Sequence, residues 1–208
     1  MTHRHSTGFD RLAPYYDRIA RLVYGEEIVK AQTTFLACIP EGARVLILGG
    51  GTGWILNAIL ENSNPGDIWY VDSSPAMVER ARKKYKSSTN VYFVTGTLDD
   101  ISATQKFDFA ITTFYLDLYS DERLSDHVEE IAKRLNRDAH WLVSDFTRSK
   151  KIFHRFLLWM MYRFFKAVCR IEASMLPRWE EVLQTRSMNK VAGGEFYNGF
   201  IKTILYRL

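Results

Sequence analysis

The sequence predicts one α/β domain built on a doubly wound, mostly parallel sheet of seven strands. Two observations lead to this prediction. Five apolar runs of strand length alternate with segments of helical period, which is typical of βαβ units with right-handed crossovers. Residues 186–208 then lack a helical period and contain Gly193-Gly194 among apolar residues, which predicts two final strands that form a hairpin at the sheet edge.

Two helical segments are predicted before the first strand. Residues 8–24 carry apolar residues on one side and are interrupted by Pro14, so we expect a short helical arm. A second helix is predicted over 26–38, and it ends before Pro40. Because both segments precede the sheet, we expect them to be appendages that cover its ligand-binding edge.

The first strand and the turn that follows it give the clearest local signal. Residues 45–48 are β-branched or aliphatic, as in a strand buried on both faces. Gly49 begins the turn GGGTG, and a helical pattern starts at Trp54. Glycine tolerates positive φ and has no Cβ, so such a turn brings backbone N–H groups close to a ligand. In an open α/β sheet this turn lies at the carboxyl ends of the strands, where these folds bind ligands.

The later elements follow in order. A second strand over 68–72 ends in Asp72. Ser74 and Pro75 then start a helix, because serine caps free N–H groups and proline lacks the one that would be unpaired. The remaining predicted elements are a helix at 121–135 and strands at 91–96, 107–114 and 139–146.

Composition indicates a globular, single-domain protein of 208 residues, with 47% hydrophobic and 25% charged residues. Its two cysteines, Cys38 and Cys169, provide neither a disulfide framework nor metal-ligand spacing. The N-terminal residues MTHRHSTGFDR lack an apolar signal core, which predicts a cytoplasmic location. His3 and His5 suggest a metal site, but we favour a frayed polar terminus.

The net charge of +4 is unevenly distributed. Residues 146–171 contain seven basic residues and no acid, so the rest of the chain has a net charge of −3. A nucleic-acid-binding protein would spread or repeat such charge, and the sequence contains no nucleic-acid-binding motif that we recognise. We therefore expect no nucleic-acid partner.

The spacing of the glycines distinguishes between nucleotide ligands. A dinucleotide fingerprint, G-x-G-x-x-G, counted from Gly49 and Gly51 would place its third glycine at position 54. That position holds Trp54, which argues against close helix packing around a pyrophosphate. A nicotinamide or flavin cofactor is therefore disfavoured.

Several motifs in the right order resemble those of class I S-adenosylmethionine-dependent methyltransferases, over about residues 8–146. VLILGGGTG is similar to the first motif of that family, and Asp72, 19 residues beyond Gly53, matches the acid at the end of its second strand. Gly96-Thr97-Leu98 matches the motif after strand three, and Asp108 begins the fourth-strand motif. LNRDAHWLVSDF at 135–146 is similar to the family's L-K-P-G-G-x-L-x-x-x-D-F segment.

The resemblance implies a Rossmann-like methyltransferase fold, S-adenosylmethionine as cofactor, no metal, and methyl transfer to a small or apolar acceptor. It divides the chain into an N-terminal helical arm (1–42), a cofactor-binding core (43–146), a helical lid insertion (147–185) and the C-terminal hairpin (186–208). The cofactor-binding residues that it implies are Tyr16, Gly49, Gly50, Gly51, Gly53, Asp72, Ser73, Met77, Gly96, Thr97, Leu98 and Thr113.

Two positions depart from the family pattern. Ile47 replaces the usual acid before the glycine turn, and Thr97 replaces an acid that often contacts the adenine amino group. An uncharged hydrogen-bond partner gives a weaker contact than a carboxylate. A non-catalytic protein that binds S-adenosylmethionine or S-adenosylhomocysteine is therefore the second hypothesis, and a nicotinamide-dependent reductase is the third.

Structural roles remain open for several of these residues. The position of Asp72 fits a ribose ligand, which we favour, or a helix cap; for Met77 and Tyr16, cofactor contact and plain packing are weighed equally. Asp117 and Asp145 lie near the ends of strands four and five, where a solvated loop or a capping role is favoured over an active-site role.

Residues 150–171 predict an amphipathic helix. Its apolar stripe is Phe153, Phe156, Leu157, Met160, Met161, Phe164, Phe165 and Val168, and its other side carries Arg155, Trp159, Arg163, Lys166 and Arg170. We favour packing of the stripe on the core, followed by a lid over an apolar substrate and then a membrane-surface or lipid contact. Its placement resembles ubiquinone and menaquinone biosynthesis methyltransferases, whose acceptors are lipid-tailed.

The sequence leaves the catalytic residues undetermined. Displacement at a sulfonium needs chiefly alignment and desolvation, so no fixed catalytic set is required. If the acceptor needs a base, His154, His127 or Tyr119 are available, and no pattern selects among them.

Overall fold

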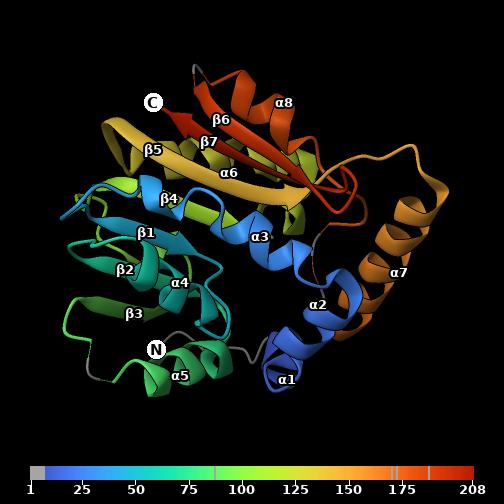
Figure 1. Cartoon of the computed structure of the whole chain (residues 1–208), viewed down its shortest axis with the longest axis horizontal. Helices are drawn as coiled ribbons and strands as arrows, with labels where there is room; N and C mark the ends of the chain where they lie inside the picture. Colours follow the sequence, from blue (N-terminus) through green and yellow to red (C-terminus); the bar gives the residue numbers. More distant parts are fainter. Residues whose placement is uncertain (1–7, 87, 170, 172, 187) are drawn as a thin grey trace.

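The computed structural model describes residues 8–86, 88–169, 171, 173–186 and 188–208. His3, His5 and Arg170, for which the sequence analysis made predictions, lie outside the described residues. Figure 1 shows one twisted sheet with helices on both faces and a helical group at one end. The strands are β1 (Val45–Leu48), β2 (Ile68–Asp72), β3 (Val91–Thr95), β4 (Phe107–Thr113), β5 (Leu135–Phe146), β6 (Asn189–Phe196) and β7 (Ile201–Arg207).

The sheet has seven strands in the order β3-β2-β1-β4-β5-β7-β6. The five strands from β3 to β5 are parallel, and the β6–β7 hairpin adds two antiparallel strands beside β5. This arrangement confirms the predicted doubly wound sheet with its C-terminal hairpin. The order reverses between β1 and β4, so the carboxyl ends of these strands border the crevice where open α/β sheets bind ligands.

The helices agree with the predicted elements, with shifts at some ends. They are α1 (Gly8–Leu12), α2 (Tyr16–Tyr24), α3 (Glu27–Thr33), α4 (Trp54–Asn62), α5 (Pro75–Lys84), α6 (Asp121–Lys133), α7 (Ile152–Cys169) and α8 (Trp179–Gln184), with short 3-10 turns at η1 (Leu36–Cys38), η2 (Leu98–Asp100) and η3 (Leu116–Leu118).

Two boundaries differ from the prediction by more than two residues. The helix predicted over 26–38 ends at Thr33, and a separate 3-10 turn at 36–38 completes the segment. β5 begins at Leu135, inside the predicted helix, because Leu135 pairs with Phe107 of β4. The register of β4 and β5 shifts just after this pair, and Asp138 has a positive φ of 65° there. This irregularity hides the start of the strand from period-based prediction.

Apolar side chains fill both faces of the sheet. One cluster includes Ile55 and Ile59 of α4 against β1, and the opposite cluster includes Leu124 and Val128 of α6. Trp179 of α8 is fully buried in the second cluster. The α8 part of the predicted lid insertion therefore packs on the core, and the lid role of the insertion stays a prediction.

A third apolar cluster joins the N-terminal arm to α7 at the end of the sheet. It contains Tyr24 of α2 and Ile28 of α3, together with Leu157 and Met161 of α7. In Figure 1, α1, α2 and α7 form the helical group beyond the carboxyl ends of the parallel strands. The predicted position of the arm over the ligand edge agrees with this arrangement.

Candidate functional site

The glycine turn lies between β1 and α4 and is tied to β2. Gly49, Gly51 and Gly53 have φ values of 70°, 67° and 88°, which favour glycine over residues with a side chain. The N–H groups of Gly49 and Gly50 both donate to the Val71 carbonyl, at 3.0 and 3.1 Å. These N–H groups are therefore satisfied by β2, contrary to the expectation that the turn presents them to a ligand.

The close approach of one side chain explains a glycine within the turn. A Cβ on Gly50 would lie 2.2 Å from Cζ of Tyr70. The Tyr70 hydroxyl then donates to the carbonyl of Gly51, at 2.7 Å. The buried tyrosine thus supports the turn from below, and only glycine fits above its ring.

Asp72 links the end of β2 to the turn. Its Oδ2 accepts a hydrogen bond from Gly51 N–H and its Oδ1 accepts one from Ser74 N–H, both at 2.8 Å. Burial raises the pKa of Asp72 above its usual value, with the nearby Asp10 adding to the shift, while the two N–H donors oppose it. The carboxylate therefore organises the local backbone as well as bordering the cavity.

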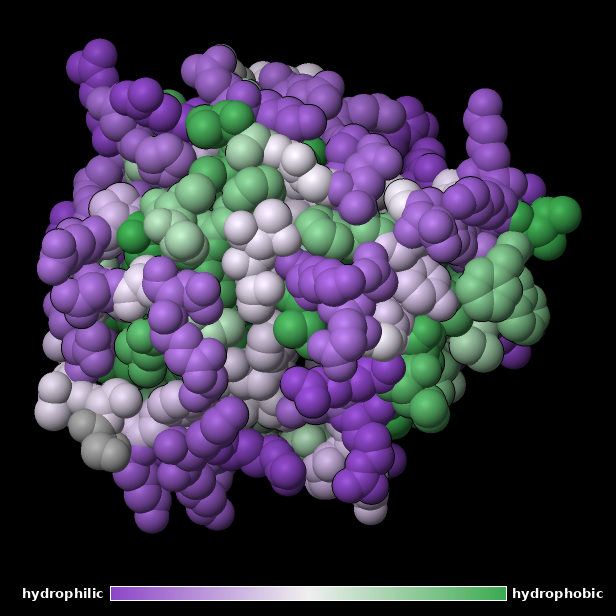
Figure 2. All heavy atoms as spheres, viewed as in Figure 1, coloured by the Kyte–Doolittle hydropathy of each residue, from purple (hydrophilic) through white to green (hydrophobic). Residues whose placement is uncertain are grey.

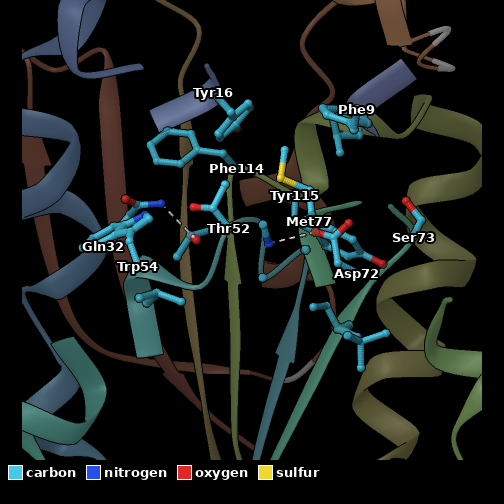
Figure 3. Close-up of a pocket in the computed structure, with 18 of the residues that line it drawn as sticks. Phe9, Tyr16, Gln32, Thr52, Trp54, Asp72, Ser73, Met77, Phe114 and Tyr115 are labelled. Atoms are coloured by element: carbon cyan, nitrogen blue, oxygen red, sulfur yellow. Dashed lines mark hydrogen bonds between the residues drawn. The ribbon is translucent and has the colours of Figure 1, made fainter. Parts of the chain in front are cut away.

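A cavity of about 160 Å³ lies over the turn, and we call it the turn cavity. Figure 3 shows Asp72, Ser73 and Met77 on one side of it and Gln32, Thr52 and Trp54 on the other. Phe9 and Tyr16 of the N-terminal arm lie above these groups. The predicted residues that line it are Tyr16, Gly49, Gly50, Gly51, Asp72, Ser73, Met77, Gly96, Thr97 and Thr113.

Two predicted site residues lie elsewhere. Gly53 is the N-cap of α4, and a Cβ there would lie 2.8 Å from Cβ of Ala81 in α5. Leu98 is 2% exposed and packs in the core beneath η2. Neither borders the turn cavity, so the structure gives both a packing role. Their motifs lie on loops that border the turn cavity, but Gly53 itself packs against α5 and Leu98 packs in the core.

The two departures from the family pattern have clear local explanations. Ile47 is buried in the apolar cluster beneath α4. Thr97 caps η2: its hydroxyl accepts from Asp99 N–H, and its own N–H donates to Asp100 Oδ2 at 2.8 Å. The first position therefore stabilises the core and the second shapes the loop after β3.

The N-terminal arm supplies acids that the sequence reasoning did not identify. Asp17 of α2 accepts a hydrogen bond from the Thr52 hydroxyl at 2.6 Å and lines the turn cavity. Asp10 of α1 accepts hydrogen bonds from the Ser74 hydroxyl and from Ala76 N–H, at 2.5 and 3.1 Å. The sequence shows two acids in a short amphipathic segment, but only the fold shows which groups these acids contact.

Gln32 and Phe114 also line the turn cavity and were not predicted. Gln32 Nε2 donates to the Thr113 hydroxyl at 3.2 Å, which connects α3 to the end of β4. Phe114 has a positive φ of 51°, an unfavourable conformation for an aromatic residue. Such strain is concentrated at functional sites, and Phe114 lies where β4 gives way to the loop that borders the cavity.

A second, larger cavity of about 270 Å³ adjoins the first, and we call it the apolar cavity. It lies between the N-terminal arm and α7, and its lining is almost wholly apolar. The residues that border both cavities are Phe9, Tyr16, Phe114 and Leu118. The two spaces are therefore neighbours that share one aromatic wall.

Asp117 and Asp145 are both buried, at 3% and 0% exposed, and do not lie on a solvated loop. Asp145 does have the predicted capping role, since it accepts from Leu116 N–H and Asp117 N–H at 3.1 and 3.2 Å and from Phe146 N–H at 2.8 Å. Asp117 borders the apolar cavity itself. The capping interpretation thus holds for Asp145 alone.

The three candidate bases differ in position. Tyr119 borders the turn cavity, and its hydroxyl lies 2.8 Å from that of Tyr115. His127 does not border the turn cavity but contacts two residues that do: its Nε2 lies 2.9 Å from the Tyr115 hydroxyl, and its ring stacks on Tyr119. His154 stacks on Phe200 and lies 2.8 Å from the Ser149 hydroxyl, outside both cavities. Only Tyr119 among them borders a cavity.

The fold and the glycine turn agree with comparisons to known proteins. The family model described as "Methyltransferase domain" matches residues 45–138, from the start of β1 into β5. Residues 45–138 thus match a methyltransferase domain. The match supports the predicted resemblance to class I S-adenosylmethionine-dependent methyltransferases, and the seven-stranded sheet confirms their Rossmann-like fold.

Relatives of this methyltransferase domain are distant. Malonyl-[acyl-carrier protein] O-methyltransferase 1 of Ilyobacter polytropus is 28% identical over 130 residues, which are 60% of this chain and 46% of that protein. The corresponding enzyme of Acetivibrio thermocellus is 26% identical over 142 residues, covering 66% of this chain and 47% of that protein. The match thus spans about half the length of these curated relatives.

Solved structures share the architecture over nearly the whole chain. A chain of the Haloferax volcanii complex between the Trm112 methyltransferase activator and a candidate methyltransferase has a TM-score of 0.73 at 16% identity, with 97% of both chains covered. Burkholderia thailandensis 1,6-didemethyltoxoflavin-N1-methyltransferase has a TM-score of 0.67 at 16% identity, covering 96% of this chain and 86% of that one. At these identities the likeness shows the fold.

Proposed function

We propose that the chain is an enzyme that transfers the methyl group of S-adenosylmethionine to a small or apolar acceptor. The observation that carries this proposal is the pair of adjoining cavities: a polar one over the glycine turn and an apolar one beside it, with a shared wall. A cofactor in the first cavity would meet an acceptor in the second across Tyr16 and Phe114.

The turn cavity fits the chemistry of the cofactor at both ends. Asp72 provides carboxylate oxygens for ribose hydroxyls, and Met77, which is 2% exposed, provides an apolar surface for adenine. Asp17, beside Thr52, provides a negative charge for the ammonium group of the methionine part. The structure of the Burkholderia enzyme contains S-adenosylhomocysteine together with 1,6-didemethyltoxoflavin, so this fold holds such a pair of ligands in that enzyme.

The reaction needs alignment more than a dedicated catalytic group. A lone pair of the acceptor forms a bond to the methyl carbon while the bond from that carbon to sulfur breaks, and sulfur keeps the electron pair. The cationic sulfonium becomes a neutral thioether, and the methylated acceptor loses a proton. An apolar cavity excludes water from the reacting atoms, and the aromatic wall fixes the approach of the acceptor.

The non-catalytic alternative rests on the local roles of Ile47 and Thr97, neither of which offers a carboxylate to the ligand. Asp17 compensates for the acid that Ile47 replaces, because α2 brings its carboxylate to the glycine turn. The reductase alternative has Trp54 against it, since this side chain borders the turn cavity.

Two measurements test the proposed function. Calorimetric titration should show binding of S-adenosylmethionine and S-adenosylhomocysteine but not of NAD(P)H; the opposite selectivity would refute the cofactor assignment. Incubation of the protein with tritiated-methyl S-adenosylmethionine and a cell extract should then label an extractable molecule. Cofactor binding without any transfer would favour the non-catalytic alternative.

α7 provides a possible lipid contact in addition to its cavity-lining face. Leu157 and Met161 pack inward, but Phe153, Phe156 and Phe164 of the same predicted stripe are 61%, 56% and 40% exposed. The expectation that the whole stripe packs on the core is therefore wrong: the arm covers only one side of the helix. Figure 2 shows apolar surface over the part of the molecule that α7 occupies in Figure 1.

We infer that this exposed face of α7 touches lipid surfaces transiently, as an extension of the proposed function. Trp159 is 60% exposed beside Arg155 and Arg163, which have no ion pair within the described part of the chain. Aromatic rings flanked by arginines suit the interface of an anionic bilayer. No helix among the described residues has the length and apolar character that crossing a bilayer requires. The cytoplasmic location and the lid role of 147–185 stay predictions.

A further inference from the structure

One carboxyl group in the apolar cavity has an atom that the fold does not use. Asp117 belongs to η3, directly after the strained Phe114, and it is 3% exposed. Its Oδ1 is buried without a hydrogen-bond partner among the described residues. A buried carboxyl oxygen without a partner is costly, because desolvation is not compensated. Its position on the wall of the apolar cavity suggests that a ligand supplies the partner.

The surroundings of Asp117 determine what kind of partner fits. Asp145 lies below it and holds three backbone N–H donors, so the negative charge of this buried pair is favoured on Asp145. Burial, together with the charge of Asp145, raises the pKa of Asp117 well above its usual value. The raised pKa favours the neutral form of Asp117, and a neutral carboxyl both accepts and donates a hydrogen bond.

The other polar groups near Asp117 are phenols. Tyr16 and Tyr24 line the apolar cavity, and the Tyr162 hydroxyl donates to the backbone carbonyl of Asp117 at 3.1 Å. Burial and the neighbouring Asp117 raise the pKa of all three phenols, so they remain uncharged. Arg148, whose charge acts on Tyr162, donates to the Leu176 carbonyl at 2.9 Å and does not line the cavity.

The lining of the apolar cavity thus lacks a positive charge within the described part of the chain. Its described side chains include no lysine, arginine or histidine. An anionic ligand would lose its hydration there without a counter-ion, close to the Asp117–Asp145 carboxyl pair, so its binding is disfavoured. A neutral ligand with a single hydrogen-bonding head and an apolar body avoids this cost.

We propose that Asp117 selects the methyl acceptor: the apolar cavity receives a neutral molecule whose hydroxyl or amine hydrogen binds Asp117 Oδ1, and it rejects carboxylates. That the ligand is a methyl acceptor rests on the proposed function, whereas the binding preference rests on the cavity alone. A neutral acceptor would distinguish this chain from its curated relatives, whose names give malonyl-[acyl-carrier protein] as the acceptor.

Three matched probes test the selection: para-butylphenol, butylbenzene and para-butylbenzoate. Equilibrium dialysis with saturating S-adenosylhomocysteine measures the affinity of each for the wild-type protein. We expect the phenol to bind about tenfold tighter than butylbenzene, because one buried hydrogen bond is gained, and the benzoate to bind weakest. Equal affinities, or tightest binding of the benzoate, would overturn the proposal.

Variants assign the preference to the carboxyl group. Asp117→Leu should bind phenol and butylbenzene equally, whereas Asp117→Asn, which keeps an accepting oxygen, should retain most of the preference. A preference that survives in a folded Asp117→Leu would exclude the role of this residue. Ala20→Phe, which fills the cavity from α2, should weaken both neutral probes about equally; unchanged affinities would place the probes elsewhere and refute the site.

Calorimetry with S-adenosylhomocysteine on the same samples separates this inference from the proposed function. Absence of nucleoside binding refutes the methyltransferase proposal, while phenol selectivity through Asp117 still stands as a property of the cavity. Nucleoside binding with no discrimination among the probes refutes the selection by Asp117 and leaves the methyltransferase proposal intact.

Discussion

The carboxylate of Asp72 accepts a hydrogen bond from the backbone N–H of Gly51, 21 residues earlier in the chain, at 2.8 Å. Replacing Asp72 with alanine should weaken S-adenosylhomocysteine binding between ten- and a hundredfold, because both the turn and the ribose lose a charged acceptor. Calorimetry measures this loss. Asp108→Ala is the matched control, since Asp108 also accepts a backbone N–H, from Arg44, but lies outside the site. Equal losses in both variants would contradict a ligand role for Asp72.

Asp17 is predicted to replace the acid that the family places at position 47. Asp17→Asn should weaken S-adenosylhomocysteine about tenfold, because an ammonium group loses its counter-ion. Binding of adenosine, which lacks the amino-acid part, should be unchanged. The two titrations together report where the carboxylate acts, and an equal loss for both ligands would show a general disturbance of the turn.

Gly53 is predicted to serve packing more than binding. Gly53→Ala should cost about 2–4 kcal/mol of unfolding free energy, since it combines a positive φ of 88° with a Cβ only 2.8 Å from that of Ala81. Gly42→Ala has a similar φ of 70° with open space around the new Cβ, and should cost about 1–2 kcal/mol. Urea unfolding of both variants measures the difference; a Gly53→Ala cost no larger than that of Gly42→Ala would exclude the close contact with α5.

His127 should make stability depend on pH in the mildly acidic range. Burial lowers its pKa from 6.5 to about 4, so the folded state disfavours the protonated ring. Its contribution to stability is complete above pH 6.5 and is lost as the pH falls from there towards 4, by about 3 kcal/mol at most. Urea unfolding of the wild type and of His127→Gln across this range isolates the histidine. Parallel curves for the two proteins would contradict the shift.

The exposed face of α7 should bind anionic vesicles in a salt-sensitive manner. Trp159→Ser and Phe156→Ser should each reduce flotation with phosphatidylserine liposomes several-fold, because an exposed apolar side chain is removed from the contact. Val191→Ser on β6 removes an equally exposed apolar side chain, 53% exposed, and should have no effect. Failure of the wild type to float even at low salt would end the lipid hypothesis.

Local patterns predicted the fold correctly, while the cofactor-binding role of the predicted residues stays a prediction. The strand 45–48, the turn behind it and the Ser74 cap are each determined by residues adjacent in sequence, and the structure places all three as predicted. Periodicity and glycine placement report short-range geometry directly, since both act within a few residues. Two of the predicted cofactor-binding residues, Gly53 and Leu98, do not border the turn cavity, although each lies next to a residue that does.

Long-range placement could not be predicted from the sequence. Asp10 and Asp17 reach Ser74 and Thr52 because α1 and α2 fold against distant segments, and no local period encodes those contacts. The same holds for α7: its periodicity predicted an apolar stripe but not how much of that stripe the N-terminal arm would leave exposed. The start of β5 was missed because strand pairing with Phe107 outweighs the helical pattern there.

Phe9 and Tyr16 belong to the wall of both cavities, and both come from one short segment that Asp10 fastens to α5. A single displacement of this segment would uncover both compartments at once. Entry and departure of the two ligands would then share one kinetic step. The rate of that step would depend on the hydrogen bonds of Asp10 to Ser74 and Ala76, which lie outside both cavities. Loosening Asp10 should shorten the residence of nucleoside and acceptor by the same factor.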